Sequence, residues 1–184
     1  MIIRYINYGY SIIKGFVKRV YLESFPKDER FPFWILTACS RESNVHLQGI
    51  LVDDKPVGMQ FSVNYDDITY LMYFAIDKTF RGKGFGSQSL RNWVARYNNV
   101  LLCIERPVDS ETVRRKTFYL NNGFYSTGCI IEDNGVEYEF LSTEKGYKPK
   151  EEILKDRYKY MSSSPFIRFV ISHIFNTKSI NYVN

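Results

Sequence analysis

Several features that define common protein classes are scarce in this sequence. Only three cysteines occur, Cys39, Cys103 and Cys129, and none forms a Cys-x-x-Cys pair. The sequence therefore indicates neither a zinc site nor a disulfide framework. The two histidines, His46 and His173, have no neighbouring nucleophile or metal ligand in the sequence, and we interpret both as structural. No metal site is predicted.

Long apolar runs are also missing. A membrane-spanning helix needs about 18 or more consecutive apolar residues, and no segment of the chain reaches that length. The apolar runs near the N-terminus are short and interrupted, which argues against a signal peptide. Unpaired cysteines are typical of a reducing compartment. Together these absences predict a cytoplasmic protein without a transmembrane segment.

Basic residues are in excess but are not concentrated. The formal net charge is +5 and the isoelectric point is about 9.0. This charge suits nucleic acid or an anionic membrane, and suits a polyanionic cofactor equally well. The longest basic run is Arg114-Arg115-Lys116. We therefore expect no nucleic-acid partner, and we keep a basic nucleic-acid or membrane-surface binding module as an alternative.

The most informative stretch runs from Leu71 to Ser87. An apolar strand ends near Ile76, and a short turn leads to glycines interspersed with Arg81 and Lys83, where a helix is expected to open at about Gly86. Glycines let the backbone turn sharply and approach a ligand closely. The first amides of a helix have no partner within it and attract anions. The stretch therefore predicts a phosphate-holding loop, although a solvated basic turn would look similar.

Apolar periodicity predicts a mixed α/β chain at a size typical of one domain. A helix is expected from Ser11 to just before Pro26, and a second short one from Phe31 to Cys39. Three strands joined by tight turns then form an antiparallel meander. After the loop come a helix, a strand, a helix ended by Gly123, and a hairpin. The predicted strands are residues 45–52, 57–65, 68–76, 100–105, 124–132 and 136–141, with a possible first strand within residues 1–10.

Two segments resemble one known family. Arg81, Gly84 and Gly86 fit the pattern Arg-x-x-Gly-x-Gly, which resembles the acetyl-CoA pyrophosphate loop of the GNAT-type N-acetyltransferase superfamily. Neither a Walker loop nor G-x-G-x-x-G fits the same residues. Residues 116–124 resemble the family's F-Y-x-x-x-G-F segment, and they match it at Phe118, Tyr119, Gly123 and Phe124. The predicted order of elements is also that of a GNAT domain.

The resemblance covers roughly residues 1–142 and implies a fold. That fold is α/β (α+β), with a mixed, mostly antiparallel, twisted sheet of about six to seven strands flanked by helices, as in acyl-CoA acyltransferases. Residues 143–184 are predicted to be a basic, partly helical C-terminal extension, with a helix over Phe166–Phe175. We expect the extension to pack on the domain or to contribute to a homodimer contact.

By resemblance, the protein binds acetyl-CoA as its acyl donor. The backbone around Phe74, Ala75 and Ile76 would bond the pantetheine arm in a gap between two parallel strands, which is where open α/β sheets bind ligands. The side chains of Phe74 and Ile76 could equally be ordinary core residues. The pyrophosphate would be held by the loop residues Arg81, Gly82, Lys83, Gly84, Phe85, Gly86 and Ser87.

The resemblance implies N-acetyltransferase chemistry, with Tyr119 as proton donor to the leaving thiolate. A phenol with an ordinary pKa near 10 is protonated at neutral pH and can supply that proton. Glu105 is the candidate general base, although it could instead pair with Arg114 or Arg115. The acceptor, a small amine or an amine of a peptide or protein, carries no motif. A GNAT fold that binds CoA without catalysis is the remaining alternative.

Overall fold

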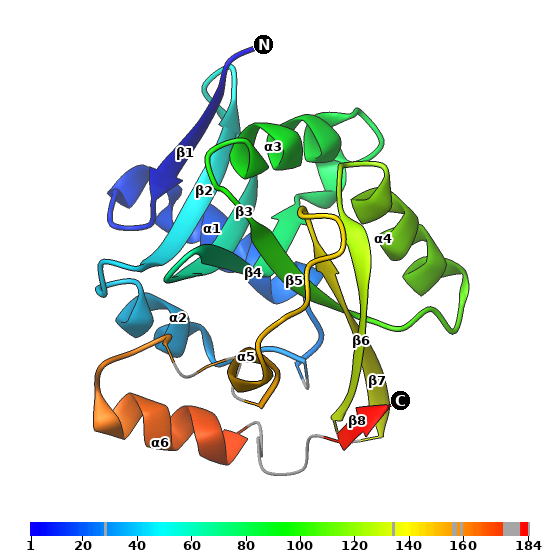
Figure 1. The fold of residues 1–184 in the computed structure, drawn as a ribbon. Coiled ribbons are helices and arrows are strands. Elements are labelled where there is room, and N and C mark those ends of the chain that lie inside the picture. Colours follow the sequence, from blue (N-terminus) through cyan, green and yellow to red (C-terminus); the bar gives the residue numbers. More distant parts are fainter. Residues whose placement is uncertain (28, 134, 156–157, 159, 175–180, 184) are drawn as a thin grey trace.

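The described residues fold around a single sheet of eight strands (Figure 1). The computed structural model describes residues 1–27, 29–133, 135–155, 158, 160–174 and 181–183. In the sheet the strands follow the order β1-β2-β3-β4-β5-β7-β6-β8. Their bounds are β1 Ile3–Asn7, β2 Val45–Val52, β3 Lys55–Tyr65, β4 Ile68–Ile76, β5 Val100–Glu105, β6 Tyr125–Asp133, β7 Val136–Ser142 and β8 Asn181–Val183. The helices are α1 Ser11–Ser24, α2 Phe33–Cys39, the short 3-10 helix η1 Lys78–Phe80, α3 Phe85–Val94, α4 Ser110–Leu120, α5 Glu151–Lys155 and α6 Pro165–Ile174.

The predicted fold class is confirmed. Among the described strands only β4 and β5 pair in parallel, as a strand–helix–strand crossover through α3 requires. Predicted boundaries hold to within a few residues, and α3 begins at Phe85 instead of Gly86. The sheet has one strand more than expected, because β8 pairs with β6 at the edge. The predicted end of the last helix, Phe175, lies outside the described residues.

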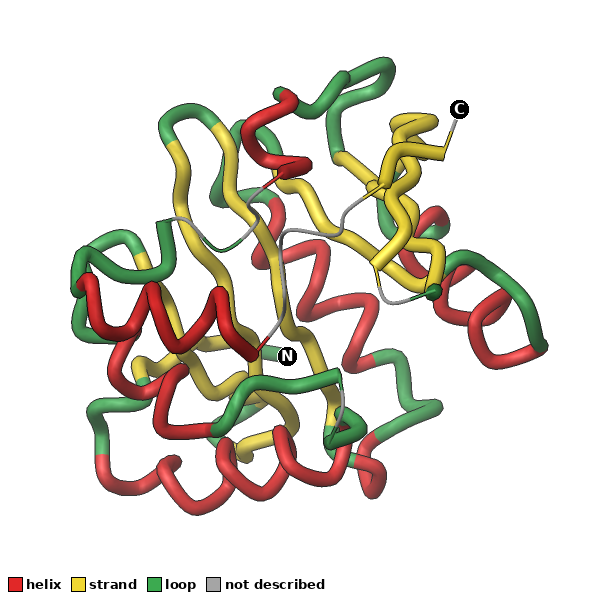
Figure 2. The backbone as a smooth tube through the Cα atoms, turned by 90° about the horizontal axis from the view of Figure 1, so that it is seen from below, coloured by secondary structure: helices red, strands yellow, loops and turns green. Residues whose placement is uncertain are grey.

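Helices flank the strands on both sides of the sheet (Figure 2). On one side α1 buries an apolar stripe that includes Ile13, Val17 and Tyr21, and α2 packs in the same cluster. On the other side Leu90 and Trp93 of α3 pack with residues of β5 and α4 in a second cluster. The central strands β4, β5 and β7 supply residues to both clusters, because successive side chains point to opposite faces.

The helix α4 is fixed at both of its ends. Asp109 caps its N-terminus, where the carboxylate accepts from the Thr112 amide at 2.8 Å. Gly123 follows the C-terminus with a φ of +89°, the left-handed conformation in which glycine is favoured. The end at Gly123 was expected from the sequence. The two ends set the position of the helix that carries Tyr119.

Four residues of the C-terminal extension pack on the same face as α1 and α2. Ile153, Leu154, Met161 and Ile171 are all buried in the main apolar cluster. The Glu42 carboxylate accepts hydrogen bonds from the backbone amide and the hydroxyl of Ser163, at 2.9 and 2.7 Å. The extension therefore contributes to the core. Its division from the remainder of the chain at residue 143 stays a prediction.

We predict that Gly58→Ala destabilises the sheet beside the end of β4. A Cβ atom at position 58 would lie 2.4 Å from the Ala75 carbonyl oxygen, so the backbone of β3 or β4 would have to move. Such overpacking lowers the free energy of unfolding by about 1–3 kcal/mol. Gly15→Ala in α1 is the control, because nothing lies within 4 Å of its added Cβ and alanine favours a helix. Urea denaturation of both variants checks this, and equal midpoints would contradict it.

Candidate active site

The two parallel strands of the sheet pair only briefly. The ladder between β4 and β5 covers Thr69, Tyr70 and Leu71 of β4, yet β4 continues to Ile76. On the other edge of β4 the register with β3 shifts, so that Met72 has no residue opposite it. Such a bulge bends a strand and increases its twist. Beyond Leu71 the two strands therefore separate, and the edge of β4 that faces β5 is left open.

The open edge contains the three residues predicted to bind pantetheine. Phe74 stacks on Phe118 of α4, with ring centroids 6.4 Å apart, and Ala75 is buried toward the opposite face. The Ile76 carbonyl already accepts a hydrogen bond from the Arg81 Nε at 2.9 Å. The side chains of Phe74 and Ala75 thus have packing roles, and any ligand contact would be made by the backbone.

The glycine loop leads directly into α3. Gly82 and Gly84 have φ values of +76° and +80°, so both need the left-handed conformation that glycine adopts at low cost. Gly84 is the N-cap residue, and the first bond within the helix runs from the Gln88 amide to the Gly84 carbonyl at 3.1 Å. The amides of residues 85–87 have no partner within the helix and lie at the positive end of its dipole. This is the geometry of an anion site.

Gly86 lies where β4, α3 and α4 meet. A Cβ atom there would be 3.4 Å from the Ile76 side chain and 3.6 Å from the Phe118 ring. The structure thus brings together the two sequence segments that carry the family resemblance. Sequence reasoning missed Asn122, whose side-chain amide nitrogen lies 3.2 Å from the Ser87 Oγ and 2.6 Å from the Phe118 carbonyl. The only sequence indication was its place before the helix-ending glycine.

The basic side chains of the loop are engaged with the protein. Arg81 donates to the Ile76 carbonyl and also to the Ser24 Oγ at 3.3 Å. The Lys83 Nζ donates to the Thr79 carbonyl at 3.0 Å and lies over the Phe80 ring. These contacts connect the loop to neighbouring protein groups, and the predicted contacts of Arg81 and Lys83 with a pyrophosphate stay predictions.

Tyr119 is half-buried on α4 near the open strand edge. Its ring makes edge contacts with Phe118 and Phe124, at centroid distances of 5.3 and 5.5 Å. Burial raises the pKa of Tyr119 to about 12, with the nearby Arg115 charge opposing the shift. Within the described part of the chain the hydroxyl makes no hydrogen bond, so its proton is free to be donated.

Glu105 ends β5, and its carboxylate lies 3.9 Å from the Arg115 guanidinium. Its side chain is 30% exposed. Arg115 is thus close to both predicted catalytic residues, Tyr119 and Glu105. The structure thus contains the ion pair with Arg115 that the sequence left open as an alternative role for Glu105. The carboxylates of Glu137 and Glu139 on β7 are also paired, each at 2.6 Å from a basic side chain.

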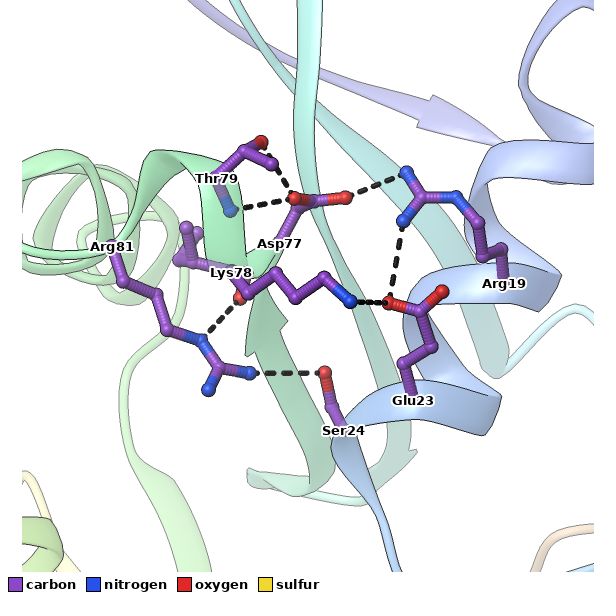
Figure 3. A network of polar contacts seen from close by, with 8 residues as sticks. Arg19, Glu23, Ser24, Asp77, Lys78, Thr79 and Arg81 are labelled. Atoms are coloured by element: carbon purple, nitrogen blue, oxygen red, sulfur yellow. Dashed lines mark hydrogen bonds and ion pairs between the residues drawn. The ribbon is translucent and has the colours of Figure 1, made fainter.

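A polar network lies at the end of β4, and sequence reasoning missed it (Figure 3). The Asp77 side chain is 2% exposed and pairs with the Arg19 guanidinium of α1 at 2.6 Å. Its other oxygen accepts from the backbone amide and hydroxyl of Thr79, at 2.8 and 2.7 Å. Burial alone would raise the pKa of Asp77, but these hydrogen bonds and the Arg19 charge outweigh it and lower the pKa to about 2.

The histidines and cysteines have no catalytic arrangement. His46 shares a hydrogen bond with the Asn64 amide group, and burial lowers its pKa. Within the described residues none of the three cysteines forms a disulfide. Among the described residues no group of His, Cys, Asp and Glu side chains could hold a metal ion. No described helix is long and apolar enough to cross a bilayer.

Comparison with known proteins identifies the family of the chain. The sequence matches the family described as the acetyltransferase (GNAT) family over residues 14–124. The chain belongs to the GNAT acetyltransferase family. The family resemblance predicted from its two sequence segments is thereby confirmed. Comparison with curated proteins gives no match.

Solved structures show the same fold at low sequence identity. A GNAT-family protein from Bacteroides thetaiotaomicron is 21% identical, with a TM-score of 0.68, and the match covers 95% of this chain and 98% of that one. The ribosomal-protein-S18-alanine N-acetyltransferase from Escherichia coli is 10% identical, with a TM-score of 0.59 and coverage of 82% and 98%. Naa50 of Arabidopsis thaliana, solved with the bisubstrate analogue CoA-Ac-MVNAL, is 15% identical, with a TM-score of 0.56 and coverage of 76% and 97%.

We predict that Asp77→Asn lowers stability in a pH-dependent way. The folded-state pKa of Asp77, about 2, lies below the ordinary value. The carboxylate therefore contributes stability that is present above about pH 4 and is lost as the pH falls toward 2. The variant should be less stable than the wild type by about 2 kcal/mol at neutral pH. The difference in unfolding free energy should vanish near pH 2. Denaturant titrations at several pH values check this, and a pH-independent difference would contradict it.

Proposed function

We propose that this protein is an acetyl-CoA-dependent N-acetyltransferase that transfers the acetyl group directly to a primary amine. The observation that carries the proposal is the meeting of three features at Gly86. They are the open edge of β4, the unpaired amides at the start of α3, and the α4 segment that bears Tyr119. Membership of the GNAT acetyltransferase family supports the choice of donor.

The donor would lie along the separation of β4 and β5. Its diphosphate would accept hydrogen bonds from the amides of residues 85–87, favoured by the positive end of the α3 dipole. The pantetheine arm would bond the backbone of residues 74–76, as an added strand bonds a sheet edge. The Ile76 carbonyl already accepts a hydrogen bond from Arg81, so the other backbone groups of residues 74–76 would bond the pantetheine arm.

The transfer step uses one proton donor and one base. The amine nitrogen attacks the thioester carbonyl carbon, an N–C bond forms, and the C–S bond breaks with its electron pair leaving on sulfur. Tyr119 gives its proton to the thiolate and regains one from solvent. Glu105 is the candidate that takes the proton released by the amine, directly or through water, in competition with its contact to Arg115.

A primary amine is the acceptor class that we propose, either on a small molecule or on a peptide or protein. Two solved structures with this fold support it, one named for acetylation of a ribosomal protein and one holding an analogue in which CoA is joined to a peptide. Glu137 and Glu139 do not offer unpaired carboxylates for recruiting an ammonium group, since Arg106 and Lys116 neutralise them. The acceptor is thus expected to be recognised by other contacts.

Gly86→Glu should abolish donor binding. The new side chain would press on Ile76 and Phe118, and its carboxylate would repel the diphosphate. We expect saturable acetyl-CoA binding by the wild type in the micromolar range and an affinity loss greater than about 100-fold in the variant, by isothermal titration calorimetry. Gly15→Glu places the same change on α1 in open space and should bind like the wild type. No heat from the wild type itself would refute the proposed function.

Tyr119→Phe should slow the chemical step and spare donor binding. Loss of a positioned proton donor lowers kcat by about 100-fold or more, while the phenyl ring keeps its packing. Free thiol released from acetyl-CoA with a panel of amines measures this. Tyr125→Phe is the control, because that side chain is 44% exposed.

The pH profile gives an independent check on Tyr119. The Tyr119 hydroxyl loses its proton only as the pH rises through about 12. Deprotonation of Tyr119 should therefore cause no decrease in the kcat of the wild type between pH 7 and 10. An unchanged kcat in Tyr119→Phe would exclude the donor role. Donor binding without turnover for any amine would identify a CoA-binding fold without catalysis.

A further inference from the structure

Helix α1 is fastened to the segment that leads into the glycine loop (Figure 3). Arg19 pairs with Asp77 at 2.6 Å, Glu23 with Lys78 at 3.4 Å, and the Ser24 Oγ accepts from Arg81 at 3.3 Å. We call these three contacts the α1 latch. They join the last two turns of α1 to the residues directly after β4. Apart from Arg19, the same residues and Val20 line a pocket between the two elements.

Asp77 is the centre of the latch. Its amide donates to the Val57 carbonyl at 2.9 Å, which anchors it to β3. One carboxylate oxygen caps η1 through Thr79, and the other accepts from Arg19. With its backbone and both oxygens held, Asp77 fixes the direction in which η1 leaves the sheet. That direction determines where Gly82 and the following turn begin.

Arg19 is the charge that makes this arrangement stable. A carboxylate that is 2% exposed needs a paired charge and hydrogen bonds, because desolvation otherwise disfavours its ionised form. In the described structure the Asp77 carboxylate is ion-paired with Arg19, which reaches it from a helix outside the loop. The two nearby basic side chains have other partners. Lys78 forms an ion pair with Glu23, and Arg81 donates to the Ile76 carbonyl and the Ser24 Oγ, so neither takes the place of Arg19 beside Asp77.

We propose that Arg19 is a positioning residue for the acyl donor. By holding Asp77 it sets η1 and the glycine loop so that the amides of residues 85–87 face the diphosphate. This inference rests on the proposed function. It assigns part of the donor affinity to a residue on α1, outside the loop and outside both sequence segments that carry the family resemblance. Arg19 itself need not touch the ligand.

The test compares two donors in Arg19→Gln. Acetyl-CoA carries the diphosphate that the loop would hold, whereas S-acetylpantetheine lacks the diphosphate and the nucleotide. The variant should raise KM for acetyl-CoA by about tenfold with kcat nearly unchanged. Its kcat/KM for S-acetylpantetheine should stay within about twofold of the wild type. A purely structural defect would lower activity with both donors. Arg19→Lys, which keeps the charge, should recover most of the acetyl-CoA affinity.

Two further variants complete the experiment. Lys18→Gln removes one charge from an exposed neighbour on α1 and should leave both donors unaffected, which controls for general attraction of an anion. Should Arg19→Gln fail to fold, Ser24→Ala weakens the latch without leaving a buried charge, and should raise KM for acetyl-CoA alone by about two- to threefold.

The outcomes separate this inference from the proposed function. An unchanged KM for acetyl-CoA in a folded Arg19→Gln protein, or equal losses with both donors, would overturn the positioning role and leave the proposed function intact. Absence of acetyl-CoA binding by the wild type would overturn both.

Discussion

Hydrogen bonding between β4 and β5 ends at Leu71 and Leu102 while both strands continue, and the candidate site depends on this early end. A ladder that ran on to Ile76 would use the backbone groups of β4 and close the space beside them. The bulge at Met72 bends β4 away from β5. Helices α3 and α4 meet the open edge of β4 at Gly86. The candidate site thus lies where the pairing of two neighbouring parallel strands ends before the strands do.

Much of this could be predicted from sequence, for identifiable physical reasons. Gly82, Gly84 and Gly123 stand where the backbone needs a positive φ, a requirement that few other residues meet. Apolar spacing placed α1 and α3, because the apolar residues of a helix that covers a sheet must recur about every 3.6 residues. The prediction that Tyr119 and the glycine loop belong to one site came from family resemblance, since no periodicity relates two segments so far apart.

Other parts could not be predicted, because they depend on contacts between distant residues. Nothing in the sequence around Met72 marks a bulge, since it arises from the register with β3. The pairing of Arg19 with Asp77 joins residues 58 positions apart, and charge pattern alone does not select that pair from the many available. The part of Arg81 and Lys83 in holding a pyrophosphate stays a prediction. The structure shows both side chains bonded to nearby protein groups, contacts that composition could not reveal.

The buried residues of the C-terminal extension have a consequence for the order of events during synthesis. The family-matched region, residues 14–124, leaves the ribosome well before Met161 and Ile171, yet both complete the main apolar cluster. Because a nascent chain folds from its N-terminal part onward, that cluster stays partly uncovered until residues 161–171 have been synthesised. A chaperone that shields apolar surface would have its longest opportunity to act during this interval.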